Sequence, residues 1–305
     1  MKVGLFYGGG QDVESHVQGA VDAEKDGFDS MFYGQIFGPD VLTVIAMAGQ
    51  RTKRIEFGTS VVPTYPRHPH VMAQEALTTA AATEGRFTLG IGLSHAPVVQ
   101  GMWGLSYDRP AVHMREYLTI LNSLIQSGSA SFSGEFFKVN VQIMFPVQHR
   151  PSVMIAALAP VMLKIAGQMS AGTITWMVGP KTLESHIVPR LNKAAEEAGQ
   201  PQPRVVVGLP VAVTEKTDEA RERAGRAFAI YGTLPNYQRM LGIEGAGGPA
   251  DVAIVGDEKA VERQIRDLAS AGATDFIAPL FPVGDDAAAS LARTRALVKS
   301  LVGKV

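Results

Sequence analysis

The sequence predicts a closed barrel of eight parallel strands with surrounding helices, an α/β fold of the (β/α)8 TIM-barrel type, in a single domain of residues 1–305. Two observations lead to this fold. Short β-rich runs alternate with helical patterns from one end of the chain to the other, and eight such runs can be counted. The length of 305 residues accommodates one barrel with inserted loops. A doubly wound open sheet is the alternative, because alternation alone does not show whether the sheet closes.

The first half of the chain establishes this alternation. The first β-rich run ends at Gly8-Gly9-Gly10, which indicates a turn, and Asp12 stands where it can cap the following helix. That helix carries apolar residues every three to four positions. The elements expected in order are strand 2–7, a helix from 13, strand 28–33, helix 41–48, strand 55–62, helix 71–82, strand 87–91, and a helix after Asp108 that ends near Gly128.

Residues 129–150 interrupt the alternation. The run Ser131–Val141, with Gly134 in its middle, predicts a small hairpin inserted at this point. The alternation then returns, and Asp257 and Gly272 mark the two ends of one helix. The elements expected are strand 153–156, a helix from Pro160, strand 173–177, helix 182–198, strand 205–213, helices from about 218 and from Asp257, strand 275–280 and helix 285–301.

Composition and charge narrow the classes of function. Hydrophobic residues make up 46% of the chain and charged residues 19%, which is typical of a soluble globular protein. The 28 basic and 29 acidic residues nearly balance, so no basic field attracts nucleic acid. The absence of cysteine excludes disulfides and thiolate-based sites. The apolar run Val153–Leu163 is too short to span a membrane, and the N-terminus lacks signal-peptide features, so a cytoplasmic location is expected.

A barrel of this kind places its active site at the C-terminal ends of its strands, so the residues that follow each strand are the candidates. No three His or carboxylate residues fall among them, and His68-Pro69-His70 would lack further ligands, so no metal site is expected. The candidates are Tyr7, Gln35, Thr59, Ser60, Val61, Ser94, His95, Ala157, Leu158, Ala159 and Trp176.

Three segments carry a resemblance to a known family: 57–69 (FGTSVVPTYPRHP), 71–74 (VMAQ) and 85–92 (GRFTLGIG). Together with Arg115-Glu116 and Ala271-Gly272-Ala273, they resemble the luciferase-like monooxygenase superfamily over nearly the whole chain. Within it, the sequence is most similar to the branch that uses the deazaflavin coenzyme F420, with FMN as the alternative cofactor. The resemblance implies a (β/α)8 barrel that forms a homodimer and holds the cofactor at its C-terminal face.

The resemblance also implies which residues contact the cofactor. Members of the branch have a non-proline cis peptide in the third strand, and the matching bond here is Ser60–Val61, after Thr59. They hold the cofactor phosphate at a glycine-containing step after the fifth strand, which reads Ala157-Leu158-Ala159 here. The backbone N–H groups before a helix can still bind phosphate, although Leu158 is bulkier than the usual glycine. Residues expected beside the cofactor as well are His68, Ser94 and Trp176.

The position of the catalytic base departs from the family. A sugar-phosphate dehydrogenase of the branch has an Asp-His pair after the second strand, where this chain has Gln35 and Ile36. Because Ile36 cannot remove a hydroxyl proton, we expect substrate reduction rather than alcohol oxidation. His95 is the candidate proton donor, and its alternative role is that of a polar residue at the barrel rim. Gln35 either hydrogen-bonds the deazaflavin or satisfies the end of its strand.

The substrate pocket and the loops complete the prediction. Tyr7, Trp103, Tyr107 and His113 are expected to line the pocket, whereas His16, His149 and His186 are expected at the surface. The loops 96–108 and 129–150 are expected to close over the site. The predicted function is hydride transfer between F420 and a small organic substrate, an activated alkene, imine or carbonyl. An FMN-dependent monooxygenase and a non-catalytic flavin- or deazaflavin-binding protein are the alternatives.

Overall fold

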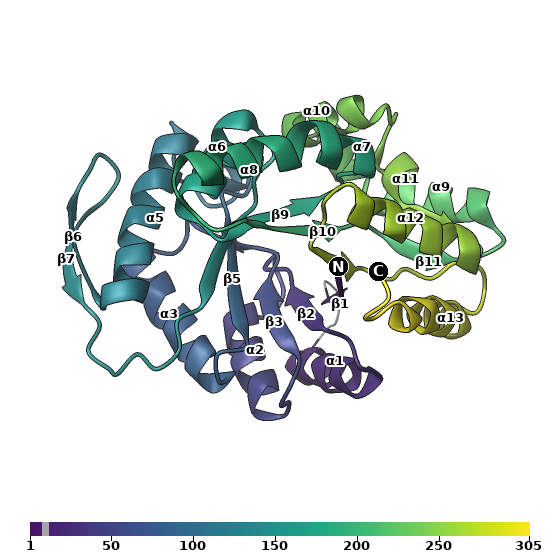
Figure 1. Cartoon of the computed structure of the whole chain (residues 1–305), viewed down its shortest axis with the longest axis horizontal. Coiled ribbons are helices and arrows are strands. Elements are labelled where there is room, and N and C mark those ends of the chain that lie inside the picture. The colour runs from purple at the N-terminus through teal and green to yellow at the C-terminus, as the bar shows by residue number, and fades with distance from the viewer. Residues whose placement is uncertain (8–11) are drawn as a thin grey trace.

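Eight parallel strands pair side by side and close into a barrel in the computed structural model, which describes residues 1–7 and 12–305 (Figure 1). The closing contact places Phe57 of β3 opposite Phe87 of β5. The predicted (β/α)8 barrel is therefore confirmed, and the open sheet is excluded. In their order around the barrel, the strands are β3 (Glu56–Thr59), β2 (Ser30–Tyr33), β1 (Lys2–Tyr7), β13 (Asp275–Ala278), β10 (Arg204–Gly208), β9 (Gly172–Trp176), β8 (Ser152–Ile155) and β5 (Phe87–Gly92).

The third strand is interrupted at its C-terminal end. It resumes as β4 (Val62–Pro63), which also pairs with β5, and the Ser60–Val61 peptide bond between β3 and β4 is cis. The cis bond implied by the resemblance is therefore confirmed. The Thr59 hydroxyl spans the interruption, because it donates to the Gly90 carbonyl at 2.7 Å and accepts from the Gly90 N–H at 2.8 Å.

Helices surround the barrel and begin largely where the sequence places them. Asp12 and Asp257 cap their helices as predicted, accepting from the N–H groups of Ser15 and Ala260. The turn predicted at Gly8-Gly9-Gly10 lies outside the described residues. The helices are α1 (Val13–Asp26), α2 (Val41–Gln50), α3 (Pro69–Ala82), α4 (Ala96–Gly101), α5 (Pro110–Ser127), α6 (Pro160–Met169), α7 (Pro180–Thr182), the π-helix η1 (Leu183–Ile187), α8 (Val188–Glu197), α9 (Thr217–Ala227), the 3-10 helix η2 (Ala229–Thr233), α10 (Pro235–Glu244), α11 (Pro249–Val252), α12 (Glu258–Ser270) and α13 (Ala287–Ser300).

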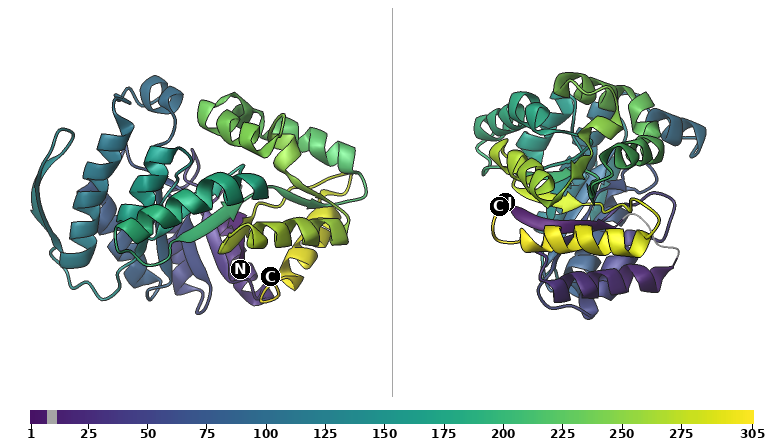
Figure 2. Two further views of the ribbon diagram at one scale, coloured as in Figure 1. Left: turned by 45° about the horizontal axis from the view of Figure 1, so that its top comes forward. Right: turned by 90° about the vertical axis from the view of Figure 1, so that its right-hand side faces the viewer.

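The predicted strand 205–213 is wrong, because two strands occupy this stretch. After β10, the chain passes Pro210 and forms β11 (Val211–Val213), which pairs with β12 (Ile254–Gly256) in a separate two-stranded sheet. Proline has no backbone N–H to continue the barrel ladder, and its carbonyl instead accepts from the Ile254 N–H. Helices α9, α10 and α11 form a group at this edge of the barrel (Figure 1 and the left view of Figure 2).

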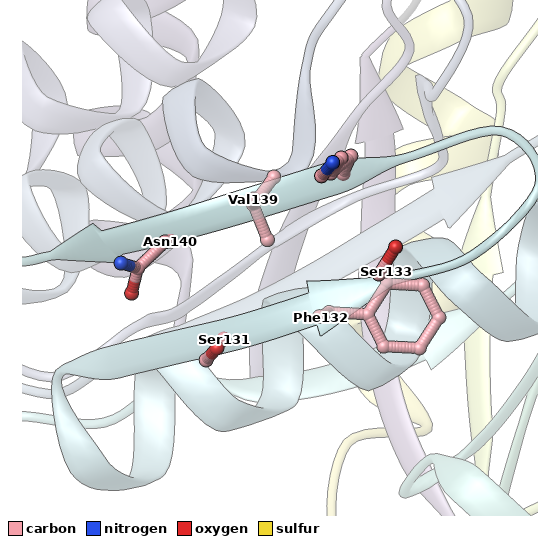
Figure 3. Close-up of a pocket in the computed structure, with 6 residues that line it drawn as sticks. Ser131, Phe132, Ser133, Val139 and Asn140 are labelled. Atoms are coloured by element: carbon pink, nitrogen blue, oxygen red, sulfur yellow. The ribbon is translucent and has the colours of Figure 1, made fainter.

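The predicted hairpin is confirmed, as β6 (Ser129–Ser133) and β7 (Lys138–Gln142). It packs on the outside of α5 instead of closing over the strand ends, and Figure 1 shows it at the outer edge of the molecule. The Glu116 carboxylate of α5 holds the hairpin turn by accepting from the N–H groups of Glu135, Phe136 and Phe137 at 2.7, 2.9 and 3.1 Å. A shallow hollow along the two strands, shown in Figure 3, is lined by hairpin residues alone.

Apolar side chains fill the middle of the barrel. Five buried residues from five strands meet there, and two glycines on neighbouring strands leave room for them. A Cβ atom at Gly58 would lie 2.2 Å from the ring of Phe32, and one at Gly90 would lie 2.4 Å from Ile174. The five buried residues are Phe32, Met154, Ile174, Val206 and Ile277. Layered packing of this kind is what a filled (β/α)8 barrel requires.

Ion pairs fill the N-terminal end of the barrel. Arg204 of β10 binds Glu56 of β3 at 2.7 Å and Asp275 of β13 at 2.6 Å, and Thr88 of β5 donates to Glu56 at 2.9 Å. Burial alone would raise the pKa of Glu56, but the charge of Arg204 and hydrogen bonds from Arg204 and Lys2 outweigh it and leave that pKa below its ordinary value. We call these residues, with Lys2, the ion-pair layer.

The length and hydropathy of the helices show whether any of them could span a membrane. No helix of the described residues is both long and apolar enough to cross a bilayer.

Candidate active site

The inner side chains at the C-terminal ends of the strands form the floor of the barrel mouth. Phe6 of β1 and Trp176 of β9 stack with ring centroids 5.9 Å apart, and both are half-buried. Val61, from the cis peptide, lies beside Gly92, where a Cβ atom would come 2.6 Å from the Val61 side chain. Small residues occupy the other inner positions, namely Gly34, Ala156 and Gly208. The floor therefore combines three large apolar side chains with small neighbours.

Tyr7 lies on the other face of its strand. Its ring centroid is 4.7 Å from that of His16 in α1, and it packs beside Gly19 of the same helix. Successive side chains of a strand point to opposite faces, so the inward position at the end of β1 belongs to Phe6. Sequence reasoning missed Phe6, because strand alternation places Phe6 and Tyr7 on opposite faces but only the structure, in which Gly4 faces Ser30 inside the barrel, shows which face is inward.

Aromatic rings extend from this floor across one side of the mouth. Trp176 makes an edge contact with Tyr231 of η2 at 5.8 Å between centroids, and Tyr231 meets Tyr237 of α10 at 5.0 Å. Tyr237 reaches His95 at 5.8 Å. We call Trp176, Tyr231 and Tyr237 the aromatic wall. Sequence reasoning missed its two tyrosines, because they follow no strand of the barrel; the only available signal was three aromatic residues within 228–237.

His95 adjoins the Tyr237 end of this wall, at the position that precedes α4. Its side chain makes no capping hydrogen bond, and it is half-buried. Burial lowers the pKa of His95 below its ordinary value, so the imidazole is mostly neutral at pH 7, and its protonated form is a stronger acid than an exposed histidine. Ser94, before it, has a left-handed backbone with φ of 60°. The structure thus brings His95 and Trp176 to one mouth, joined through the rings of Tyr237 and Tyr231.

Tyr107 and His113 belong to a second aromatic group. The ring of Tyr65 stacks on Tyr107 at 5.4 Å and on His113 at 4.2 Å between centroids. The Tyr107 hydroxyl donates to the Ser94 carbonyl at 3.3 Å, and His113 Nε2 lies 3.3 Å from the Thr64 hydroxyl. Burial lowers the pKa of His113 to about 4, so it is neutral at pH 7. This stack continues to Phe137 of the hairpin, whose ring centroid lies 5.2 Å from that of His113.

Two further predicted residues lie at the rim. Trp103 follows α4 and is half-buried, and its backbone N–H donates to the Val98 carbonyl at 3.1 Å. His68 caps α3 by accepting from the His70 N–H at 3.2 Å, and its ring meets Phe137 at 5.6 Å. His68 is exposed and lies beside the hairpin. Residues 1–7 and 12–305 contain no group of three metal-binding side chains.

The predicted phosphate step lies at the start of α6. The Ala157 N–H is already used, because it donates to the Thr173 hydroxyl at 3.2 Å. The Leu158 carbonyl accepts from His186 Nε2 at 2.8 Å, and Ala159 precedes α6 without a side-chain cap. The first turn of α6 therefore presents N–H groups that the helix itself cannot satisfy. The amides available to an anion are those after Ala157.

The surface assignment of the remaining histidines is wrong for two of them. His186 and His16 are each only 6% exposed. His186 holds the Leu158 carbonyl, and His16 packs against Tyr7 and places its Nδ1 2.8 Å from the Asp12 carbonyl. His149 is half-buried beside Gly85. A histidine inside a helix gives no local sign of the loop or ring that covers it.

Gln35 supports the helix that follows its strand. Its Oε1 atom accepts from the Val41 N–H at 2.9 Å, which satisfies a donor in the first turn of α2. Ile36, the next residue, is 56% exposed. The position that matches the histidine base of the sugar-phosphate dehydrogenase therefore holds a solvent-facing apolar side chain.

The family relationship is clear at the level of the whole chain. The sequence model described as Luciferase-like monooxygenase matches residues 1–301. The chain belongs to the luciferase-like monooxygenase family. The enzyme class predicted from the resemblance, an oxidoreductase of this family, is therefore confirmed.

Two relatives indicate the range of this family. A putative coenzyme F420-dependent oxidoreductase of Mycobacterium tuberculosis is 36% identical over 126 residues, which are 41% of this chain and 36% of that protein. An F420-dependent glucose-6-phosphate dehydrogenase of Gordonia bronchialis is 31% identical over 204 residues, which are 61% of this chain and 60% of that protein. The matched segments cover less than two thirds of either relative.

Solved structures share the fold. An F420-dependent secondary alcohol dehydrogenase in complex with an F420-acetone adduct superposes with a TM-score of 0.79 at 18% identity, over 100% of this chain and 98% of that chain. The oxygenating constituent of 3,6-diketocamphane monooxygenase of Pseudomonas putida, in complex with FMN, gives 0.78 at 20% identity, over 100% and 99%. At these identities the likeness concerns the barrel architecture.

Proposed function

We propose that this enzyme is an F420H2-dependent reductase of a small organic substrate with an activated alkene, imine or carbonyl group. The observation that carries the proposal is the distribution of titratable groups at the mouth: His95 offers a proton donor, and Ile36 replaces the base that alcohol oxidation would need. The F420-dependent relatives support this choice of cofactor.

The residues at the mouth fit such a cofactor. The small residues Gly92 and Ala156 let the Val61 side chain pack down onto the floor, where a flat ring would rest on it, and a Cβ atom at Gly92 would press against Val61. The amides of Leu158, Ala159 and the first turn of α6 suit a phosphate. Thr59 holds the floor in place through its two hydrogen bonds to Gly90. Bound here, the reduced deazaflavin supplies a hydride, and so two electrons in one step.

The chain's own residues supply the proton. Hydride addition at the β-carbon of an activated alkene would move the C=C electron pair toward the carbonyl group, so the α-carbon would then need a proton. The imidazolium of His95 gives up this proton and is reprotonated from solvent, which balances the reduction. Its lowered pKa makes the protonated form a stronger donor. The Tyr237 ring of the aromatic wall lies 5.8 Å from His95, so a substrate protonated by His95 would lie against an apolar ring.

Cofactor preference tests the first half of the proposal. Purified protein is titrated with F420 and, separately, with FMN, and the quenching of cofactor fluorescence is followed. We expect tighter binding of F420, at micromolar concentrations. Preference for FMN would overturn the proposal and favour oxygen chemistry.

Turnover tests the second half. Protein with F420H2 is mixed with a panel of enones, imines and ketones, and F420 formation is followed by its absorbance. We expect oxidation of F420H2 that depends on the substrate. Tight F420 binding with no turnover across the panel would favour a non-catalytic binding protein.

A further inference from the structure

The aromatic wall forms a continuous surface with His95 at one end and the barrel floor at the other. Ring centroids join His95 to Tyr237 at 5.8 Å, Tyr237 to Tyr231 at 5.0 Å, and Tyr231 to Trp176 at 5.8 Å. All four side chains are half-buried, so each keeps part of its surface accessible. Phe228 supports Trp176 from behind with an edge contact at 5.7 Å. A ligand beside His95 therefore meets ring faces and edges.

The polar atoms on this surface are hydrogen-bond donors without formal charge. Burial raises the pKa of Tyr237, so its hydroxyl keeps its proton. Burial also raises the pKa of Tyr231, and the neighbouring Trp176 only partly opposes that rise. The Trp176 Nε1 atom is buried and has no hydrogen-bond partner among the described residues. A ligand carbonyl oxygen suits the two tyrosine hydroxyls, because it can accept without bringing charge.

Helix α10 carries two charged residues, Arg239 and Glu244, and Glu244 is occupied elsewhere. The Glu244 carboxylate accepts from the N–H and the hydroxyl of Thr182 at 2.8 and 2.7 Å, and so caps α7. Binding of a sugar phosphate requires charged or multiple polar partners for the phosphate and hydroxyl groups. The side chains that contact one another between His95 and Trp176 are aromatic.

We infer that the aromatic wall is the substrate subsite and that it takes an uncharged cyclic enone, with its ring against the nearly perpendicular rings of Tyr237 and Tyr231, the face of one and the edge of the other, and the alkene toward His95. This inference rests on the proposed function for the direction of the reaction, but the binding itself does not require the cofactor. Aromatic side chains pack against flat apolar rings through face or edge contacts.

The chain contains two tryptophans, so Trp103→Phe leaves Trp176 as a single fluorescent probe inside the wall. Protein with this substitution, without cofactor and then with F420, is titrated with 2-cyclohexenone, with carvone and with glucose 6-phosphate. We expect saturable quenching of Trp176 by both enones and none by glucose 6-phosphate. Equal binding of glucose 6-phosphate, or no saturable quenching by the enones in either form, overturns the inference.

Variants locate the binding. In the same background, Tyr237→Ala is expected to weaken enone binding roughly tenfold through loss of the stacking ring. Tyr237→Phe retains the ring and is expected to weaken enone binding less than threefold, which separates the contribution of the ring from that of the hydroxyl. Phe136→Ala, a half-buried aromatic residue of the hairpin, is the matched control and is expected to leave the affinity unchanged. Weakening by Phe136→Ala but not by Tyr237→Ala would overturn the inference.

The two proposals fail separately. Enone binding without any F420 binding would overturn the proposed function and retain the subsite. F420 binding without enone binding at Trp176 would overturn the subsite and retain the cofactor assignment.

Discussion

The two ends of the barrel interior are filled by different kinds of side chain, charged at one end and apolar at the other. At the N-terminal end, Arg204, Glu56 and Asp275 fill the interior with paired charges, and Asp275 is only 2% exposed. At the C-terminal end, Phe6, Val61 and Trp176 lie among glycines and an alanine, and the side chains are half-buried. Ion pairs close the N-terminal end, and removal of one partner would leave a buried charge unpaired and destabilise the folded state. The C-terminal end is left open to a ligand, so changes there should alter binding and turnover more than stability.

The largest effect is expected from breaking the ion-pair layer. Arg204→Met would leave Glu56 and Asp275 without their partner, and we expect the free energy of unfolding to fall by about 3–5 kcal/mol. Denaturant unfolding followed by circular dichroism measures this. Arg226→Met removes an exposed pair with Glu222 and serves as the control, with a change of less than about 1 kcal/mol. Equal losses in the two variants would contradict the structural role of the layer.

The second-largest effect is expected at the C-terminal end of the barrel, from loss of His95. His95→Ala removes the proposed proton donor, and we expect kcat/KM for enone reduction to fall roughly 100-fold. Because His95 makes no capping hydrogen bond, the midpoint of unfolding should stay within error of the parent. Steady-state kinetics and a fluorescence titration with F420 are measured together. Normal turnover with normal F420 affinity would remove His95 from the mechanism.

The pH profile sharpens the assignment of His95. Burial lowers the pKa of His95 below about 6.5, so the protonated donor is lost as pH rises through that lowered value. We expect kcat/KM to be highest at acidic pH and to fall up to tenfold per pH unit above it. In His95→Ala this limb should be absent. A rate that rises with pH across the same range would indicate a base in place of an acid.

The smallest effect tests the floor of the mouth. Gly92→Ala places a Cβ atom 2.6 Å from the Val61 side chain, which must move toward the space proposed for the cofactor ring. We expect F420 affinity to weaken about fivefold, with stability changed by about 1 kcal/mol. Gly101→Ala, where a Cβ atom meets nothing within 4 Å, is the control. Unchanged affinity would place the ring elsewhere.

Local patterns explain what could be predicted. Asp12, Asp257 and Gly128 mark helix ends through interactions with residues three or four positions away, and the structure has all three ends there. The hairpin at 129–142 also follows from a local run around Gly134. The candidate site was predicted in part, since His95 and Trp176 follow strands and so reach the mouth in any such barrel. Tyr231 and Tyr237 were missed because helices outside the alternation carry them.

The sequence by itself determined the order of the strands and helices, the helix caps and the family, because each depends on neighbouring residues or on motifs read along the chain. The tertiary structure decided which side chains meet. It closed the sheet through β3 and β5, turned Phe6 inward and Tyr7 toward α1, and buried His16 and His186. These outcomes depend on contacts between residues far apart in the chain, whose free energy no local pattern contains.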